Sequence, residues 1–404
     1  MKHHSINYLL IKCFLIAASF SVVIYLRHYG LDNRTMVTFF AFVGLFYLSI
    51  SNKKELFITG SFVGLLWFYW IALSFRYVDL EWVVPFVMIA VALAYGLLFW
   101  VLGWIKNQYL RLVVLLFYFD YVAPFGFDWF RFEVILVDSF IGVQKWQVAL
   151  FFLSIAMYHF LKEKKYRLLA LVPMLFSLDF YIPKEHENKV TLLTTHYQQD
   201  EKWDYKNRKT IIQTVLERIK EAKQNGEKIL LLPESVLPLY LNRYPVYTKE
   251  LQNLSQNMTI VLGALYKENK QHFNSTYIFQ DGKMEVAHKV FLVPFGETTD
   301  FLPRKLGRFV NEIFYGGAQD YQTAQEPTDF KIDDQLYRNA ICYESTVSEH
   351  YVGDFTFMFA LSNQAWYAPS IEPTLQYLVM KSLARKYHKV IFHSTNFGSS
   401  EVIQ

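Results

Sequence analysis

The chain has 404 residues, of which 53% are hydrophobic, 18% aromatic and 19% charged. This composition is too apolar for an ordinary soluble protein of this length, and too charged for a chain that lies in a membrane throughout. We therefore predict two parts, one in the membrane and one soluble. The net charge of +4 is too small to indicate a nucleic-acid partner, and none is expected.

Seven apolar runs follow one another in the first 183 residues, separated by short polar breaks. Several have the length of about 20 residues that a bilayer core requires, and others are shorter. The runs are Tyr8–Leu26, Met36–Ile50, Leu56–Phe75, Trp82–Ile105, Tyr109–Pro124, Trp146–Leu161 and Leu168–Ile182. The first run lacks the small-residue cleavage pattern of a signal peptide. We predict a polytopic α-helical membrane domain of about seven helices over residues 1–183.

The basic residues of the loops predict the orientation of this domain. With a cytoplasmic N-terminus, the inside segments hold nine Lys and Arg residues and the outside loops hold five. The bias is sharpest in the loop at 162–167. An odd number of membrane helices then places residues 184–404 outside the cytoplasm.

The segment Phe125–Lys145 has the sequence pattern neither of a membrane-spanning helix nor of a polar loop. Its aromatic residues and the charges of Asp128, Arg131, Glu133 and Asp138 suit a segment at the outer membrane surface. Two interpretations stay open: a lipid-facing loop with packing aromatics, or a role in the entry of a lipid.

From Lys184 onward, strands alternate with helices. Helical spacing of apolar residues predicts helices over Tyr205–Gln224 and near Ile371–Tyr387. Asp281 and Gly282 indicate a hairpin turn. Strands are predicted at Val190–Thr195, Lys228–Leu232, Met258–Tyr266, Phe273–Gln280, Met284–Val293, Arg338–Cys342, Phe355–Leu361 and Val390–Ser394. This alternation predicts an α/β sandwich over residues 184–404.

Three predicted strands carry reactive side chains at or near their ends. Glu234 follows a strand in LLLPES, Lys289 lies in HKVFLVPFGE, and Cys342 ends the strand of AICYES. Taken singly, each residue has an ordinary structural role. Glu234 suits an acid at a helix N-terminus, Lys289 a solvent-facing strand residue, and Cys342 a small core residue. Together they supply a carboxylate that takes a thiol proton, an ammonium that stabilises a tetrahedral intermediate, and a nucleophile. Cys13 lies in an apolar run, so we expect Cys342 to be a free thiol.

These motifs and their order resemble the nitrilase (carbon–nitrogen hydrolase) superfamily, and more narrowly the apolipoprotein N-acyltransferase family. The shared sequence motifs are KWD at 202–204, LPES, LVPFGE at 292–297, CYE, SNQAW at 362–366 and STNFG at 394–398. The resemblance covers nearly the whole chain. It implies a nitrilase-like αββα domain on the periplasmic side of a multi-pass domain in the bacterial inner membrane.

The resemblance also implies roles for individual residues. Glu234 matches the general base, Lys289 the oxyanion-stabilising residue and Cys342 the nucleophile. Four further residues match positions that support the site or bind substrate, with ion pairing or core packing as their alternative roles. These are Glu297, Glu344, Tyr343 and Trp203.

The implied reaction moves an acyl chain from a phospholipid to a cysteine thioester. The acyl chain then passes to the α-amino group of the diacylglyceryl-cysteine of an apolipoprotein. The partners are thus a phospholipid donor, an apolipoprotein acceptor and the membrane. No cofactor or metal is implied, and we expect a monomer. The aromatic residues near the site are predicted to pack as core or to line an acyl channel: Phe291, Phe295, Phe301, Trp366 and Tyr367.

The sequence departs from the family pattern in three places. Gln364 replaces an acid, and residues 298–300 replace the usual aromatic and proline. No apolar run for an eighth, C-terminal membrane helix follows the catalytic motifs. We expect these departures to affect the loop over the site and the anchoring of the domain rather than the identity of the site.

Two other functions stay open. The first is a membrane-tethered amidase of the nitrilase type that acts on a small amide. The second is a transporter or lipid-binding protein with a degenerate soluble domain. We expect no cluster of intramembrane charges that marks a transport path, and the complete set of Glu234, Lys289 and Cys342 argues against degeneracy.

Overall fold

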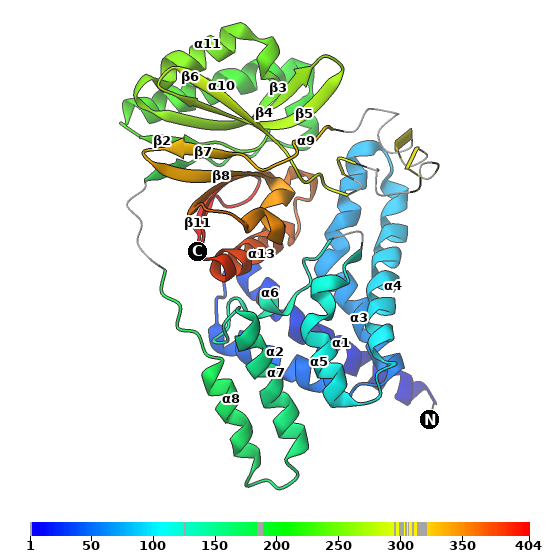
Figure 1. Ribbon diagram of the computed structural model, residues 1–404. Coiled ribbons are helices and arrows are strands. Elements are labelled where there is room, and N and C mark those ends of the chain that lie inside the picture. The colour runs from blue at the N-terminus through cyan, green and yellow to red at the C-terminus, as the bar shows by residue number, and fades with distance from the viewer. Residues whose placement is uncertain are drawn as a thin grey trace. The chain divides into compact units, whose positions relative to one another are not determined.

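The computed structural model of the chain contains two compact units (Figure 1). It describes residues 2–124, 127–183, 189–294, 296–298, 303, 305, 307–308, 311–312 and 321–404. The helical unit comprises Met1–Ile182 and Ser370–Ser382, and the sandwich unit comprises Pro183–Pro369 and Leu383–Gln404. The helix predicted near 371–387 is α13 (Glu372–Tyr387), whose residues are divided between the two units.

The helical unit consists of α-helices joined by short turns. Among the described residues, three helical stretches are long and apolar enough to cross a membrane: Ile6–His28, Lys53–Tyr77 and Glu81–Leu102. The other predicted apolar runs form shorter helices. In chain order, the helices are α1 (Lys2–His28), α2 (Arg34–Ile50), α3 (Lys53–Phe68), η1 (Tyr69–Val78), η2 (Glu81–Val83), α4 (Val84–Leu102), α5 (Gln108–Tyr121), α6 (Phe132–Leu136), α7 (Lys145–Phe160), η4 (Arg167–Ala170) and α8 (Leu171–Phe176).

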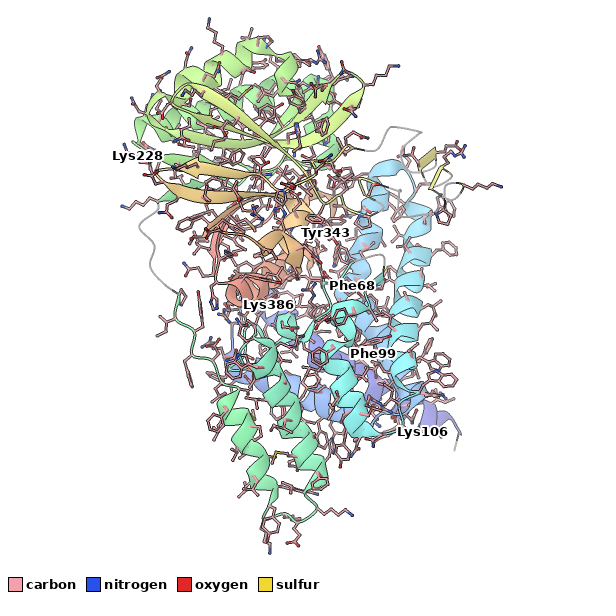
Figure 2. All side chains as sticks on the ribbon, viewed as in Figure 1. Phe68, Phe99, Lys106, Lys228, Tyr343 and Lys386 are labelled. Atoms are coloured by element: carbon pink, nitrogen blue, oxygen red, sulfur yellow. The ribbon has the colours of Figure 1, made fainter. Side chains whose placement is uncertain are left out.

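Glycine allows α3 and α4 to pack closely. A Cβ atom at Gly60 of α3 would lie 2.5 Å from the carbonyl oxygen of Tyr95 on α4. Aromatic side chains fill the space around this contact, where Phe68 stacks on Tyr95 and Phe99 packs against Phe119 (Figure 2). Close backbone approach and aromatic burial therefore join the helices of this unit.

Most of the described segment after Phe127 is buried against other residues rather than facing lipid. Every residue from Trp129 to Val137 is buried, and α6 packs against α1, α2 and α7. Glu133 of α6 forms an ion pair with Lys145 (2.5 Å), which also pairs with Asp120 (2.6 Å). The interpretation as a lipid-facing loop is therefore wrong for residues 129–137, and Asp120, Glu133 and Lys145 form a charge cluster that no sequence pattern indicated.

The described residues of the sandwich unit form two β-sheets (Figure 1). The first has the order β1-β2-β4-β5-β6 with β3 beside β4, and the second has the order β11-β10-β9-β8-β7. The strands are β1 (Val190–Leu192), β2 (Ile229–Leu231), β3 (Leu237–Tyr240), β4 (Thr259–Glu268), β5 (Gln271–Gln280), β6 (Lys283–His288), β7 (Asp329–Ile332), β8 (Gln335–Ile341), β9 (Phe357–Asn363), β10 (Val390–Asn396) and β11 (Glu401–Ile403). Strands β1, β2 and β4 run parallel, as do β8, β9 and β10. The predicted fold class, a helical membrane domain with a nitrilase-like sandwich, is confirmed.

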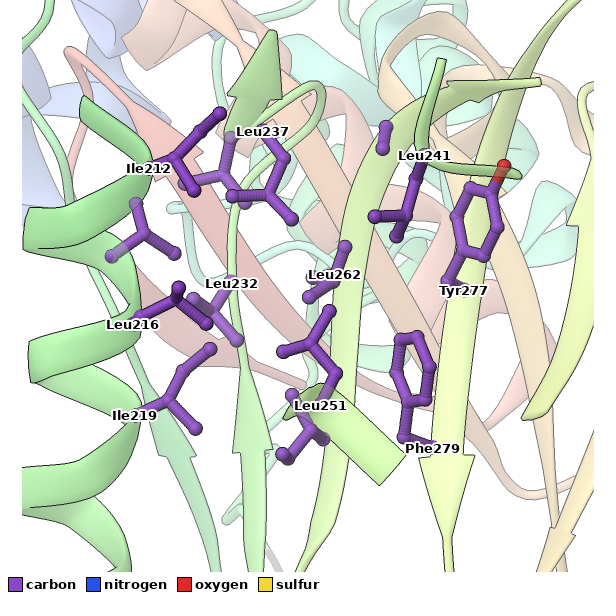
Figure 3. Packing of buried hydrophobic residues seen from close by; sticks show 14 of the residues in the cluster. Ile212, Leu216, Ile219, Leu232, Leu237, Leu241, Leu251, Leu262, Tyr277 and Phe279 are labelled. Atoms are coloured by element: carbon purple, nitrogen blue, oxygen red, sulfur yellow. The ribbon is translucent and has the colours of Figure 1, made fainter. Parts of the chain in front are cut away.

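Two apolar clusters stabilise the sandwich unit. On one side of the first sheet, α10 (Tyr205–Gln224) inserts Ile212, Leu216 and Ile219 against Leu232 and Leu262 (Figure 3). These α10 positions are those at which the sequence predicted an apolar face. A second cluster contains residues of both sheets, which shows that the sheets pack face to face: Ile229, Leu231, Val261, Ile278, Ala287, Phe330, Ile332, Tyr337, Phe357, Phe359, Leu361 and Phe392.

The strand ends differ from the prediction where the chemistry is expected. Strand β6 ends at His288, so Lys289 is the first residue after it rather than a residue within it. Strand β8 ends at Ile341, one residue before the predicted end, and Cys342 begins the short 3-10 turn η7 (Cys342–Thr346), which is followed by η8 (Ser348–Tyr351). The reactive side chains therefore lie on turns that follow strands of the two sheets.

Candidate active site

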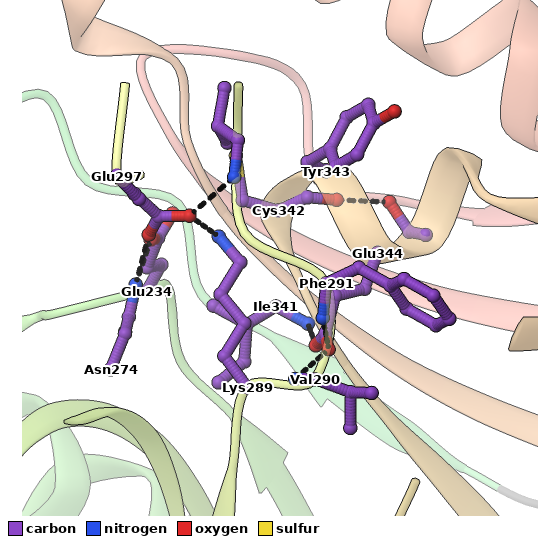
Figure 4. A network of polar contacts seen from close by, with 12 residues as sticks. Glu234, Asn274, Lys289, Val290, Phe291, Glu297, Ile341, Cys342, Tyr343 and Glu344 are labelled. Atoms are coloured by element: carbon purple, nitrogen blue, oxygen red, sulfur yellow. Dashed lines mark hydrogen bonds and ion pairs between the residues drawn. The ribbon is translucent and has the colours of Figure 1, made fainter. Parts of the chain in front are cut away.

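Three turns of the sandwich unit bring the predicted catalytic residues together (Figure 4). Glu234 lies three residues beyond β2, Lys289 follows β6 and Cys342 follows β8. Glu297 and Glu344 belong to the same polar network. Residues from distant parts of the sequence thus form one site at the ends of these strands.

Glu234 is a buried carboxylate that accepts a short hydrogen bond from a neighbouring side chain. The side-chain amide of Asn274 donates a hydrogen bond to its Oε1 at 2.7 Å. Burial raises the pKa of Glu234, and the negative charge of Glu297 raises it further, while the ammonium of Lys289 opposes both. A carboxylate with a raised pKa is suited to accept and return a proton.

The turn that carries Glu234 rests directly on β4. A Cβ atom at Gly263 would lie 2.4 Å from the backbone nitrogen of Ser235 and 2.6 Å from the Cα of Glu234. Ser235 itself has a φ of +45°, in the left-handed region. Only glycine at position 263 leaves room for this turn, so the position of Glu234 depends on it.

Lys289 is a fully buried cation with a direct counter-ion. Its Nζ lies 2.7 Å from Oε2 of Glu297, and its side chain has no exposed surface. Burial acts to lower the pKa of Lys289, but the charges of Glu297 and Glu234 outweigh burial and raise the pKa above its ordinary value. The group is therefore an ammonium at neutral pH.

Glu297 holds Lys289 in place from a turn of its own. Its Oε1 accepts a hydrogen bond from Asn274 at 3.1 Å, and its Oε2 accepts one from the backbone N–H of Val293 at 2.9 Å. The sequence placed Glu297 among the supporting residues but gave no role to Asn274, which bridges Glu297 and Glu234. Asn274 is one of several polar residues of strand β5, so its position in the sequence gave no distinct signal.

Cys342 occupies a constrained turn. Its φ is +53°, which is unusual for a residue with a side chain, and its carbonyl oxygen accepts a hydrogen bond from the hydroxyl of Ser345 at 2.6 Å. The cysteine is partly exposed, whereas the flanking Ile341 and Tyr343 are buried. A nucleophile on a sharp turn directly after a strand is the arrangement that presents a side chain to a substrate.

Glu344 joins two of the turns. Its Oε1 accepts hydrogen bonds from the backbone N–H groups of Val290 (2.5 Å) and Phe291 (3.1 Å), and its Oε2 accepts one from Ile341 (2.7 Å). The side chain is completely buried. It therefore connects the chain after Lys289 with the strand that leads to Cys342.

Two further residues near the site were not identified from the sequence. Lys202 is buried and donates a hydrogen bond to the carbonyl oxygen of Glu234, and Tyr321 has its pKa raised by burial and by the charges of Glu297 and Glu234. Trp203, next to Lys202, is half-buried at the end of the short helix α9 (Gln199–Trp203). Lys202 belongs to the motif KWD, in which only its neighbour Trp203 was a predicted site residue.

The remaining predicted positions are only partly described. Gln364, where the family has an acid, is buried and accepts a hydrogen bond from the Thr395 hydroxyl at 2.9 Å. Phe291 packs edge-on against His350. Phe295, Phe301, Thr299 and Asp300 lie outside the described residues. Within the described part of the chain, no group of three or more His, Cys, Asp or Glu side chains is arranged to hold a metal ion.

The fold and the site define a class of protein, a carbon–nitrogen hydrolase-type enzyme joined to a helical membrane unit. Residues 194–403 match the carbon–nitrogen hydrolase family, and residues 6–180 match the apolipoprotein N-acyltransferase integral membrane domain.

Comparison with curated proteins gives the family. An apolipoprotein N-acyltransferase of Wolinella succinogenes is 39% identical over 391 residues, covering 96% of this chain and 94% of the relative. A relative from Helicobacter pylori is 34% identical, and the match covers 97% of this chain and 95% of the relative. A relative from Campylobacter jejuni is 33% identical, and the match covers 100% of this chain and 91% of the relative. The chain belongs to the apolipoprotein N-acyltransferase family.

Proposed function

We propose that this chain transfers an acyl chain from a phospholipid to the α-amino group of the diacylglyceryl-cysteine of an apolipoprotein, with Glu234, Lys289 and Cys342 as the catalytic residues. The observation that carries the proposal is the buried cluster of Glu234, Lys289 and Glu297 around the turn of Cys342. The chain's membership of the acyltransferase family supports the choice of acyl transfer over amide hydrolysis.

The first half-reaction forms a thioester. The carboxylate of Glu234 takes the proton of the Cys342 thiol, and the sulfur attacks the carbonyl carbon of the phospholipid ester. The ammonium of Lys289 stabilises the oxyanion of the tetrahedral intermediate. The carbon–oxygen bond of the ester then breaks, Glu234 returns the proton to the departing oxygen, and a lysophospholipid leaves.

The second half-reaction transfers the acyl group to nitrogen. The free amine of the apolipoprotein attacks the thioester carbon, and Glu234 accepts the proton that the nitrogen loses. The carbon–sulfur bond breaks, Glu234 gives the proton to the departing sulfur, and an amide and the Cys342 thiol result. A thioester is reactive enough toward an amine for this step, and Lys289 again stabilises the oxyanion.

The helical unit supports the proposal in a second way. Both proposed substrates are lipids, and a catalytic unit covalently joined to membrane-spanning helices meets them at a raised effective concentration. The excess of basic residues in the predicted inside loops supports a periplasmic location of the sandwich unit in the bacterial inner membrane. Protease protection in sealed spheroplasts, with a cleavage site inserted near residue 226, tests this orientation.

The activity test supplies the full-length protein in detergent with a phospholipid and a synthetic diacylglyceryl peptide, and in parallel with small amides. The proposal predicts triacylated peptide and lysophospholipid from the first mixture, and neither product with Cys342→Ala. Hydrolysis of amides without acylation of the peptide would instead establish the amidase alternative.

A further inference from the structure

A second lysine of the sandwich unit is buried beside the proposed base. Lys202, on α9, has 1% of its surface exposed, and its Nζ donates a hydrogen bond at 3.0 Å to the main-chain carbonyl oxygen of Glu234. Among the described residues, no carboxylate lies within ion-pair distance of Lys202. A buried ammonium without a direct counter-ion is costly, so its retention here requires an explanation.

The helix that carries Lys202 is itself fixed. Gln199, at the start of α9, accepts a hydrogen bond at 2.9 Å from the side-chain amide of Asn363. The side-chain oxygen of Asn363 in turn accepts one from Asn396 at 2.8 Å. Gln199 and Lys202 are the buried residues of α9, whereas Asp200 and Glu201 are exposed, so Lys202 lies on the face of α9 that packs against the protein.

The charges that face Lys202 belong to the proposed catalytic machinery. Burial lowers the pKa of Lys202 to about 8, and the charges of Glu234 and Cys342 act in the opposite direction. The charge of Cys342 acts on Lys289 as well, but Lys289 differs in that Glu297 pairs with it directly. Coupling between two charges is reciprocal, so a thiolate that favours protonated Lys202 is itself favoured by protonated Lys202.

We propose that Lys202 is a positioning residue for the acyl transfer, which fixes the main chain of Glu234 and whose positive charge favours the thiolate form of Cys342. The inference rests on the roles proposed above for Glu234 and Cys342. Lys289 then serves mainly the oxyanion, while Lys202 serves the nucleophile before attack. Lys202 adds a positive charge without a direct counter-ion among the described residues, whereas Lys289 is paired with Glu297.

The experiment measures the rate of alkylation of Cys342 by iodoacetamide as a function of pH. The full-length protein carries Cys13→Ala, so that Cys342 is its sole thiol. Lys202→Met is compared with Lys209→Met, which removes the same charge from an exposed position on α10. Lys202→Arg keeps the charge, and Lys202→Gln is a second neutral variant in case Lys202→Met does not fold.

The inference predicts that the midpoint of the alkylation profile rises by about one pH unit or more in the neutral Lys202 variants, because they lack the opposite charge. Lys209→Met leaves the midpoint unchanged, and Lys202→Arg returns it toward that of the parent. A folded neutral variant with the parent's midpoint would overturn the inference, since loss of a purely structural contact does not shift this profile.

Failure of the inference about Lys202 can be distinguished from failure of the proposed function. If the parent protein forms no acyl-thioester with phospholipid, the proposed reaction fails, although the alkylation profile still reports the effect of Lys202 on the thiol. If the parent forms the thioester and the neutral variants keep the parent's midpoint, only the inference about Lys202 fails.

Discussion

Replacing Glu344 with glutamine tests whether its buried carboxylate holds the turn after Lys289 against the turn of Cys342. The carboxylate accepts three backbone N–H groups, two on Oε1 and one on Oε2. A glutamine of the same shape has one oxygen, and its NH₂ group faces a donor at the other position. At least one buried N–H group therefore loses its acceptor, and the remaining hydrogen bonds lose their charge.

The expected loss follows from these bonds. A buried donor without a partner costs about 1–3 kcal/mol, and a charge-assisted hydrogen bond exceeds a neutral one by about 1 kcal/mol. We expect Glu344→Gln to lower the free energy of unfolding of the sandwich unit by about 2–5 kcal/mol. For a unit of this size, that corresponds to a fall in melting temperature of about 5–15 °C.

The assay combines thermal unfolding in detergent with the rate of acyl-enzyme formation below the melting temperature. Glu349→Gln is the matched control, because Glu349 is an exposed glutamate on the neighbouring turn η8. We expect the control to behave as the wild type and Glu344→Gln to lose both stability and rate. A Glu344→Gln protein with wild-type stability and rate would refute the reasoning.

Three further predictions follow from the site and from α13. Gly263→Ala places a methyl group against the turn of Ser235 and is expected to slow acyl-enzyme formation at least about tenfold, measured by single-turnover kinetics; an unchanged rate would contradict the packing argument. Glu297→Gln removes a negative charge that raises the pKa of Glu234, so the acidic limb of the rate profile should move to lower pH; a move to higher pH would contradict the assignment. Burial raises the pKa of Glu372 from 4.5 to about 8, so the folded chain retains a proton that the unfolded chain releases, and stability falls as pH rises between these values. Glu372→Gln should therefore raise the melting temperature at about pH 8 and change it little at about pH 4; an equal effect at both would show that titration is not the cause.

Several features of the sandwich unit were predictable because they depend on local sequence. Glu234 and Cys342 each lie close after a strand whose final residues are buried, and apolar runs interrupted by charged or turn residues mark such strands well. Helix α10 was equally clear, since its apolar residues recur at helical spacing and Gly226 follows its end. The short sequence motifs around these residues also indicated the family, because they do not depend on the folded structure.

Other features depend on contacts between distant segments, which a single sequence does not reveal. The residues around α6 resemble a surface segment because they include several charges, yet Glu133 and Lys145 pair inside the helical unit. Lys202 resembles a surface lysine beside an aromatic residue, and only the fold shows that it reaches the carbonyl of Glu234. Short strands such as β11 contain too few residues to give a pattern.

The central claim is that Cys342 carries the acyl chain. Intact-protein mass spectrometry after incubation with a phospholipid of defined acyl chains, without an acceptor peptide, tests this claim directly. The account predicts one added acyl mass that hydroxylamine removes, that peptide mapping places on Cys342 and that Cys342→Ser does not accumulate. Accumulation of the same hydroxylamine-labile adduct in Cys342→Ser, or its location at another residue, would contradict the account.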